Sequence, residues 1–309
     1  MLSPSPSAIM TWILSTYINV FLVSVAPFAT PVTASPDADK PSIANAENRV
    51  QELAIELANI RKTIRPRHCT DLLRGGQRTS GLYNIFPNPK NPIGTVVYCD
   101  MEMDGGGWTV IQRRGQYGNS VYYFYRNWTE YAKGFGDPAK EYWIGNRVLH
   151  ALTTLPERMQ LRVILNGNDT VVIDYDSMKV ENEALLFRMR MGRFLRPLGW
   201  DALSDTNDLC FTTYDRDHDL APENCADRYR GAWWYRGCHL ANLNGLNLNG
   251  PHASYADGIE WAIQGKPERD YYYSYPSVQM MIRPAMAYAE KLIKKKGGVL
   301  GALAGPERG

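Results

Sequence analysis

The sequence predicts an α+β domain with a twisted antiparallel sheet and long irregular loops. Short runs rich in β-branched and aromatic residues, such as 108–112, 160–165 and 171–175, alternate with Gly, Asn and Asp turns. Helical periodicity appears only in pieces, for example over residues 145–152. From residue 204 to residue 273 regular periodicity nearly disappears, while Asn, Gly, Tyr and Trp accumulate. A loop region of that length usually needs a functional or covalent explanation.

The chain begins with an apolar segment. Residues 9–28 carry no charge, and the first charged residue is Asp37. Ser, Thr and Asn interrupt this run, whereas a transmembrane helix needs about 20 consecutive apolar residues. Because Val32-Thr33-Ala34 has the small-x-small pattern of a cleavage site, we predict that residues 1–34 are a secretory signal peptide. The run lacks the basic residues that normally precede such a segment, so an uncleaved anchor is the alternative.

Other features agree with export of a globular protein. Asn127 and Asn168 each start an Asn-X-Thr sequon, and both are predicted glycosylation sites of a secreted chain. The net charge is +2, which gives no basis for proposing nucleic-acid binding. With 44% hydrophobic and 21% charged residues, the composition is that of an ordinary folded domain. We therefore expect the mature protein to be extracellular.

Residues 35–66 are predicted to form a Pro-containing linker and a short coiled-coil helix. A helix of this length is marginal alone in water, because nucleation is costly and its apolar stripe lies exposed. Docking onto its own domain would cover that stripe, but we favour self-association of two or three chains, because the helix precedes the first cysteine. The apolar residues recur at alternating spacings of three and four, as in a heptad seam. The seam within residues 43–64 consists of Ile43, Ala46, Val50, Leu53, Leu57, Ile60 and Ile64.

The globular domain is predicted to span residues 67–284, and residues 285–309 form a basic tail. Within the tail, residues 288–296 are a short Lys-rich helix candidate, and Gly-rich apolar sequence follows. We expect this tail to be flexible, as chain ends usually are. Contact of the basic segment with a membrane surface is the alternative.

The chain has five cysteines. In an oxidising compartment, Cys69 with Cys99 and Cys225 with Cys238 make two natural local pairs, although the sequence does not prove the connectivity. Cys210 is then left over. It is interpreted either as a buried small apolar residue or as one half of a disulfide to another chain.

An acidic loop precedes the last two cysteines. Asp215, Asp217 and Asp219 are spaced two residues apart, and carboxylates so close repel one another unless a cation lies between them. Hard oxygen ligands favour Ca²⁺ over a transition metal. The loop is not an EF-hand, because counting from Asp215 places Leu220 where that motif has Gly and Ala226 where it has Glu. The sequence therefore predicts a loop stiffened by calcium.

The sequence does not predict an enzyme. It contains no nucleophile elbow, no zinc-binding spacing and no pair of catalytic carboxylates with a suitable base. The five histidines are scattered along the chain. His239 follows Cys238, but a disulfide-bonded sulfur is no nucleophile. A binding protein is the better interpretation.

Eleven short motifs occur in an order that resembles the fibrinogen C-terminal-like domain. They lie between residues 67 and 284, and their number and order make the resemblance highly specific. Within this family the chain resembles the ficolins and tachylectins, which are secreted innate-immune lectins. It has no Gly-X-Y repeat and hence no collagen stalk, and the heptad segment stands in its place. The motifs are CTDLL at 69–73, VYCDM at 97–101, GGGWTVIQRR at 105–114, YAKGFG at 131–136, YWIGN at 142–146, FTTYDRD at 211–217, NCA at 224–226, WWYRGCH at 233–239, NLNG at 242–245, GIEW at 258–261 and YSY at 273–275.

The resemblance implies which residues hold the calcium ion. Asp217 and Asp219 would bind it through their side chains, and Ala221 and Glu223 through their backbone carbonyls. Water would complete the coordination. Asp215 is expected to lie beside the ion without binding it directly.

The resemblance also implies a pocket that receives the acetyl group of an N-acetylated sugar. An acetyl methyl group needs a small apolar slot, its carbonyl needs a backbone donor, and its N–H needs an acceptor such as a phenolic oxygen. In the family, the peptide bond between Gly237 and Cys238 is cis, which points the Cys238 N–H at the ligand. The expected ligand-binding residues are Tyr229, Cys238, His239, Tyr255, Ala256 and Tyr271.

The predicted function is that of a secreted, calcium-dependent lectin for acetylated sugars such as N-acetylglucosamine or sialic acid on microbial or cell surfaces. The chain is longer than the family pattern between Trp261 and Tyr271, a stretch that borders the pocket and bears on specificity. A fibrinogen-like peptide pocket is disfavoured, because Arg228, Tyr229 and Ala256 stand where an acidic clamp is expected. An angiopoietin-like ligand that binds a protein receptor is the main alternative.

Overall fold

The computed structural model describes residues 48–56, 65–195, 200–263 and 271–285. The chain separates into two units, Met1–Ile55 and Glu56–Gly309, and each is described by itself. Within the described ranges, no helix is both long enough and apolar enough to cross a bilayer.

Residues 48–56 form a helix ahead of the globular domain. All of its residues are exposed, including Val50 at 66% and Leu53 at 50%, which belong to the predicted heptad seam. The other seam residues, the predicted signal peptide and the predicted tail from residue 286 onward lie outside the described residues. Self-association through residues 43–64 therefore stays a prediction.

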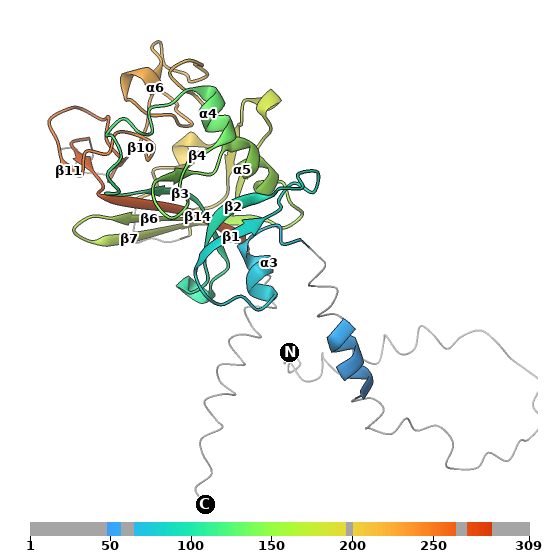
Figure 1. The fold of residues 1–309 in the computed structure, drawn as a ribbon. Helices are drawn as coiled ribbons and strands as arrows, with labels where there is room; N and C mark the ends of the chain where they lie inside the picture. Colours follow the sequence, from blue (N-terminus) through green and yellow to red (C-terminus); the bar gives the residue numbers. More distant parts are fainter. Residues whose placement is uncertain (1–47, 57–64, 196–199, 264–270, 286–309) are drawn as a thin grey trace, which may run out of the picture. The chain divides into compact units, whose positions relative to one another are not determined.

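An antiparallel sheet of eight strands forms the centre of the domain. The last strand, β14, lies between β3 and β6 in the middle of the sheet (Figure 1), so the sheet is complete only when the end of the domain has joined it. The main path runs through β1 (Gly81–Ile85), β2 (Thr95–Asp100), β3 (Trp108–Arg114), β14 (Ser277–Pro284), β6 (Met159–Asn166) and β7 (Thr170–Tyr175), and β5 (Tyr142–Trp143) pairs with β3 and with β4 (Phe135–Gly136).

Both faces of the central strands are covered. Along β14, Met280 and Ile282 pack into the main core, whereas Met281 joins a smaller cluster with Trp108 and Val110. The pairing of β14 with β3 shifts register between Met280 and Met281. Because neither face meets water, these strands appear in the sequence as nearly continuous apolar runs.

Helices α3, α4 and α5 lie outside the sheet. Helix α3 (Cys69–Arg74) is tied to β2 by the Cys69–Cys99 disulfide. Helix α4 (Trp128–Lys133) starts at a capping box, in which Asn127 accepts the Glu130 N–H at 2.9 Å. Helix α5 (Asn146–Thr153) covers part of the region that the sequence predicts as helical. Of the two predicted glycosylation sites, Asn127 is therefore a half-buried cap, while Asn168 is exposed between β6 and β7.

The segment from residue 204 to residue 263 has little regular structure, as its sequence predicts. Its elements are short: η4 (Ser204–Thr206), α6 (Cys225–Arg228), β10 (Ala241–Asn242), β11 (Gly250–Pro251) and β12 (Glu260–Trp261), with β13 (Tyr273–Ser274) pairing to β11. The remaining short elements are η2 (Met103–Gly105), η3 (Glu183–Leu185), β8 (Met178–Val180) and β9 (Met189–Met191). The fold is thus α+β with an antiparallel sheet, and that prediction is confirmed.

Buried polar side chains on β3 hold this loop-rich region against the sheet. Arg114 donates to the carbonyls of Leu243 at 3.0 Å and Gly245 at 2.9 Å, and its charge is compensated by Glu141 at 3.0 Å. Gln112 also donates to the Leu243 carbonyl, at 2.9 Å. Buried polar groups need such partners. These hydrogen bonds anchor the loops to the sheet, although the loops themselves have no regular secondary structure.

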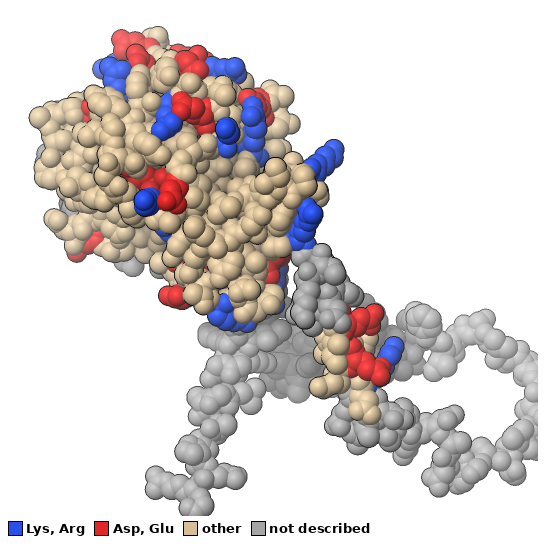
Figure 2. Space-filling view, in the orientation of Figure 1, with Lys and Arg blue, Asp and Glu red and all other residues tan. Residues whose placement is uncertain are grey.

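The outer surface of the domain carries both signs of charge. On the face drawn in Figure 2, acidic and basic side chains are interspersed rather than gathered by sign. Cys210 is half-buried and unpaired within the described part of the chain.

Candidate functional site

The acidic loop is hydrogen-bonded to the start of α4 through Asp215. Asp215 accepts the backbone N–H of Trp128 at 2.9 Å and the hydroxyl of Thr213 at 2.7 Å through the same oxygen, Oδ1. Thr213 and Arg216 exchange backbone hydrogen bonds across the turn that presents this carboxylate. Asp215 therefore fastens the loop to the first residue of α4.

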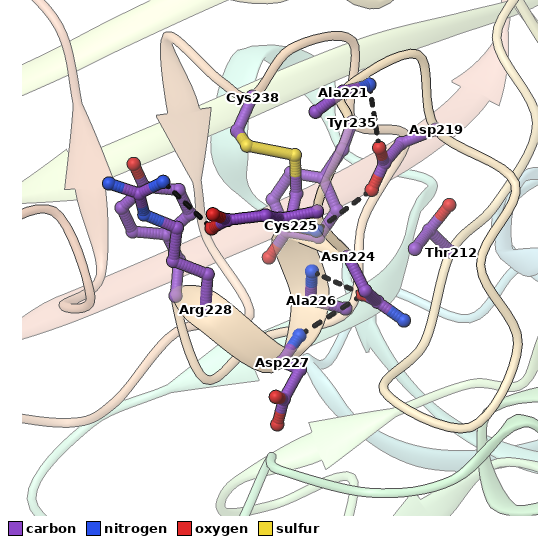
Figure 3. The surroundings of a disulfide bond; sticks show 12 residues. Thr212, Asp219, Ala221, Asn224, Cys225, Ala226, Asp227, Arg228, Tyr235 and Cys238 are labelled. Atoms are coloured by element: carbon purple, nitrogen blue, oxygen red, sulfur yellow. Dashed lines mark hydrogen bonds and ion pairs between the residues drawn. A yellow bond between two sulfur atoms is a disulfide. The ribbon is translucent and has the colours of Figure 1, made fainter.

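Asp217 and Asp219 are oriented by backbone N–H groups. Asp219 accepts from Ala221 and from Cys225, both at 2.9 Å, through its two oxygens (Figure 3). Asp217 accepts the Asp219 N–H at 3.1 Å. Burial raises the pKa of the Asp219 carboxyl group, its two backbone donors oppose that rise, and the nearby charge of Asp217 adds to it.

The chemistry of these donors fits a calcium ion. In the described part of the chain, neither Asp217 nor Asp219 forms an ion pair with a basic side chain, so two neighbouring negative charges are left uncompensated. Calcium prefers carboxylate and carbonyl oxygens of this kind. The Glu223 side chain pairs with Arg228 at 3.0 Å, which leaves the Glu223 backbone carbonyl as the predicted ligand.

A disulfide joins this loop to the next segment. Cys225, the first residue of α6, is bonded to Cys238, and the peptide bond between Gly237 and Cys238 is cis. Asn224 caps α6 by accepting the N–H groups of Ala226 at 2.9 Å and Asp227 at 3.1 Å (Figure 3). The acidic loop, α6 and the 237–238 peptide thus form one connected unit.

A pocket of about 550 Å³ opens beside this unit. Its lining includes all six residues that the sequence assigns to ligand binding, which come from four separate places in the chain. The lining consists of Asp205, Leu220, Tyr229, Arg236, Gly237, Cys238, His239, Leu240, Tyr255, Ala256 and Tyr271.

Aromatic rings form much of the pocket wall. The His239 ring lies edge-on to Tyr229, with 4.9 Å between ring centroids, and Tyr255 lies 5.3 Å from Tyr271. Ala256 donates its N–H to the Tyr271 carbonyl at 2.9 Å, which fixes the two stretches together. Ala256 has a φ of 62°, a left-handed conformation that is uncommon for a residue with a Cβ. Its methyl group is the smallest side chain with a Cβ, and it lines the pocket together with the rings.

His239 contributes an uncharged polar group to the pocket. Burial lowers its pKa to about 4, and a hydrogen bond with the Ala256 backbone opposes this shift only in part. The ring is therefore neutral at physiological pH. Its Nε2 atom lies 3.4 Å from Glu260 Oε2. A neutral imidazole here can donate or accept a hydrogen bond without adding charge.

Five lining residues lie outside the predicted set: Gly237, which was expected only as the partner of Cys238 in a cis peptide bond, and four that sequence reasoning missed. Asp205 and Arg236 form an exposed ion pair of 2.9 Å at the pocket edge, although they are far apart in sequence. Leu220, from the acidic loop, is 67% exposed, so the loop itself forms part of the wall. Arg236 lies in the WWYRGCH motif, two residues before Cys238. This closeness in sequence was the only indication that Arg236 would lie at the pocket. The fourth residue is Leu240.

The fold is that of a globular domain of fibrinogen type. Residues 65–285 match the family of the C-terminal globular domain of fibrinogen beta and gamma chains, and the protein belongs to that family. Techylectin-5A of Tachypleus tridentatus is 47% identical over 222 residues, which cover 71% of this chain and 74% of that protein. Ryncolin-4 of Cerberus rynchops is 42% identical over 220 residues, covering 71% of this chain and 61% of that protein.

Solved structures agree with this assignment. The fibrinogen-like globe domain of human ANGPTL2 is 37% identical, with a TM-score of 0.64, and the likeness covers 72% of this chain and 100% of that domain. A lamprey fibrin D-dimer complexed with the peptide Gly-His-Arg-Pro-amide is 27% identical, with a TM-score of 0.63, covering 79% of this chain and 86% of that one. The predicted family is therefore confirmed.

Proposed function

We propose that the protein is a secreted, calcium-dependent lectin that binds acetylated sugars. The observation that carries this proposal is that Ala256, His239 and three tyrosines line one pocket; the tyrosines are Tyr229, Tyr255 and Tyr271. An acetyl methyl group would fill the space beside Ala256. The Cys238 N–H would donate to the acetyl carbonyl, and a tyrosine hydroxyl would accept the amide N–H. The names of the two curated relatives, techylectin and ryncolin, agree with a lectin.

Calcium would act by shaping the pocket rather than by touching the sugar. The side chains of Asp217 and Asp219, with the carbonyls of Ala221 and Glu223, would hold the ion. Asp219 is hydrogen-bonded to Cys225, whose disulfide partner Cys238 lines the pocket. A bound ion would compensate the two carboxylates and hold this connection in place.

Binding at one such pocket would be weak, because the site is open and holds a small group. Linking several domains through the predicted helix at residues 43–64 would raise the apparent affinity for a surface by mass action alone, by a factor on the order of 10² to 10⁴. The proposed targets are therefore glycan-coated surfaces of microbes or other cells, on which several pockets can engage together.

A protein receptor is the alternative ligand. The likeness to the globe domains of human ANGPTL2 and ANGPTL6, at 37% and 34% identity, supports this candidate. Binding to a protein would use a broad surface and would not require the acetyl slot beside Ala256. We favour the lectin because the same pocket gathers every residue expected to contact an acetyl group. In either case we propose a binding protein rather than an enzyme.

Retention on an N-acetylglucosamine resin tests the proposed function. The full chain should be retained in Ca²⁺, released by EDTA, and eluted by free acetate or N-acetylglucosamine. Tyr271→Ala should abolish retention, whereas Tyr122→Ala, which removes an exposed tyrosine outside the pocket lining, should leave retention unchanged. Absence of retention by a folded protein that calcium stabilises would favour the receptor-binding alternative.

A further inference from the structure

A second group of metal-ligating side chains lies behind the pocket wall. It consists of His252, Asp257 and Glu260, and one ligand-capable atom from each lies within 4.8 Å of the other two. None of the three lines the pocket, and none belongs to the acidic loop. They come from the segment that connects β11 to β12 and carries Tyr255 and Ala256.

The ring of His252 is held in the orientation of a metal ligand. Its Nδ1 atom lies 2.9 Å from the Ser254 carbonyl oxygen, and since a carbonyl can only accept, Nδ1 carries the proton. In the neutral ring, Nε2 then has a free lone pair. Metal-binding histidines are typically fixed in this way, by a hydrogen bond from the other ring nitrogen.

The lone pair of His252 faces a carboxylate. Nε2 is shielded from solvent, makes no hydrogen bond among the described residues, and lies 3.5 Å from Glu260 Oε1. The His252 side chain is only 7% exposed, so water does not reach it from outside. In the neutral ring, this lone pair and the carboxylate repel one another, and either a proton on Nε2 or a metal ion between the two groups would relieve that repulsion.

The two carboxylates complete the group. Glu260 is fully buried, and its Oε1 atom accepts the Gly258 N–H at 3.1 Å. Asp257 Oδ1 accepts the Ser254 hydroxyl at 2.7 Å and lies 3.9 Å from His252 Nδ1. The Asp257 side chain is 18% exposed, so it has room to turn toward the ion. The other oxygen of Glu260, Oε2, lies 3.4 Å from His239 Nε2, so Oε1 is the oxygen that faces His252.

We propose that His252, Asp257 and Glu260 bind a divalent transition-metal ion, for which zinc is the chemically favoured choice. One imidazole nitrogen and two carboxylate oxygens are a ligand set that zinc accepts, with water in the fourth position. Calcium takes oxygen ligands in larger number, so the ion held here differs from the one at the acidic loop. Because zinc bonds are about 2.0–2.2 Å long, the three donors must draw closer together, and the partly exposed Asp257 side chain would supply that movement.

A metal ion at this position would cross-link both ends of the 252–260 segment. It would therefore stabilise the stretch that presents Tyr255 and Ala256 to the pocket. This consequence concerns stability and does not depend on which ligand the pocket binds. The site is thus testable even if the proposed lectin function is wrong.

Titration of the full chain with Zn²⁺ tests this proposal. The protein is prepared without an affinity tag, stripped of metal, and returned to buffer with excess Ca²⁺, so that the acidic loop is occupied. Calorimetry should then show one saturable Zn²⁺ per chain, and Co²⁺ should give the visible absorption of a site with nitrogen and oxygen ligands. His252→Gln and Asp257→Asn should each weaken Zn²⁺ binding by about 10-fold or more.

His150→Gln is the matched control, since His150 contacts the Val180 carbonyl at 2.8 Å and lies outside the group. Its Zn²⁺ binding should equal that of the parent protein. Asp257→Asn nearly preserves shape, so it keeps the test decisive if His252→Gln does not fold. The proposal is overturned if the parent protein shows no saturable Zn²⁺ binding, if Asp257→Asn binds Zn²⁺ as tightly as the parent, or if excess Ca²⁺ displaces the ion.

Discussion

Asp219 accepts the backbone N–H of Cys225 at 2.9 Å, so the acidic loop is hydrogen-bonded directly to a disulfide that reaches the pocket. A second route runs beside it, in which Leu220 donates to the Arg236 carbonyl and Arg236 to the Cys238 carbonyl, both at 2.8 Å. Cys238 receives both connections. A change at the acidic loop therefore has two short paths to the pocket wall.

Asp219→Asn should weaken calcium binding and sugar retention together. The amide has only one oxygen, so its NH₂ group would face one of the two backbone N–H donors that Asp219 now satisfies. Such a mismatch costs about 1–3 kcal/mol of folding free energy. Denaturant unfolding with and without Ca²⁺ measures both effects. Asp169→Asn, an exposed aspartate between β6 and β7, is the control and should behave as the parent protein does. If Ca²⁺ stabilised Asp219→Asn as much as the parent protein, Asp219 would not be a calcium ligand.

The stabilisation by calcium should increase as the pH rises through the acidic range. Burial raises the pKa of Asp219 above the ordinary value of 3.8, so the metal-free folded protein holds this proton more tightly than the unfolded chain does. As the pH rises through that raised pKa, the metal-free protein loses stability while Ca²⁺ no longer competes with the proton. The difference in melting temperature with and without Ca²⁺ should therefore grow from pH 4 toward pH 7. A constant difference would contradict the assignment of Asp219.

Ala256→Leu should abolish binding of acetylated sugars without unfolding the domain. The larger side chain would occupy the apolar space between Tyr229, Tyr255 and Tyr271. Ala256→Gly is the matched control, because it leaves the space open and suits the φ of 62°. The glycine variant should retain binding and lie within about 1 kcal/mol of the parent in stability. If Ala256→Leu bound the sugar as tightly as the parent protein, the acetyl group would not bind beside Ala256.

Leu53→Pro should abolish agglutination of glycan-coated particles while leaving binding of a monovalent sugar intact. Leu53 lies inside the helix at residues 48–56, where proline removes a backbone donor and costs about 3 kcal/mol or more. Light scattering gives the oligomeric state, and calorimetry with free N-acetylglucosamine gives the affinity of one pocket. Glu52→Ala, off the heptad seam, should agglutinate normally. Loss of both activities in Leu53→Pro would show that the helix supports the domain and does not link chains.

Local sequence was most informative where a site is built from contiguous motifs. FTTYDRD contains Asp215 and Asp217 of the acidic loop, and WWYRGCH contains the Cys238–His239 pair, so these residues could be assigned before their positions were known. The hydrogen bond from Trp128 to Asp215 could not be assigned in this way, because its partners are distant in sequence and neither residue type requires the other. The same holds for the ion pair between Asp205 and Arg236.

The histidine–carboxylate group formed by His252, Asp257 and Glu260 could not be predicted from the sequence either. His252, Asp257 and Glu260 have no metal-binding spacing on a helix or strand, and the sequence therefore gave no reason to group them. Their atoms meet because β12 returns the chain beside β10 and brings the buried Glu260 under the loop that carries His252. Whether these three side chains meet depends on the path of the loop between them, and this path cannot be predicted from the periodicity of the sequence.

The family, the α+β class, two plausible cysteine pairs and the expected pocket residues could all be predicted from the amino-acid sequence. These properties follow from short-range patterns: strand alternation, turn residues and ordered motifs. Folding then brings Tyr229, His239, Ala256 and Tyr271 to one pocket, as the resemblance implied. It also makes the acidic loop part of the pocket wall and places β14 in the centre of the sheet, and neither of these could be predicted. The physical reason is that these contacts join distant segments, and their geometry is set by packing against a common core rather than by local conformational preference.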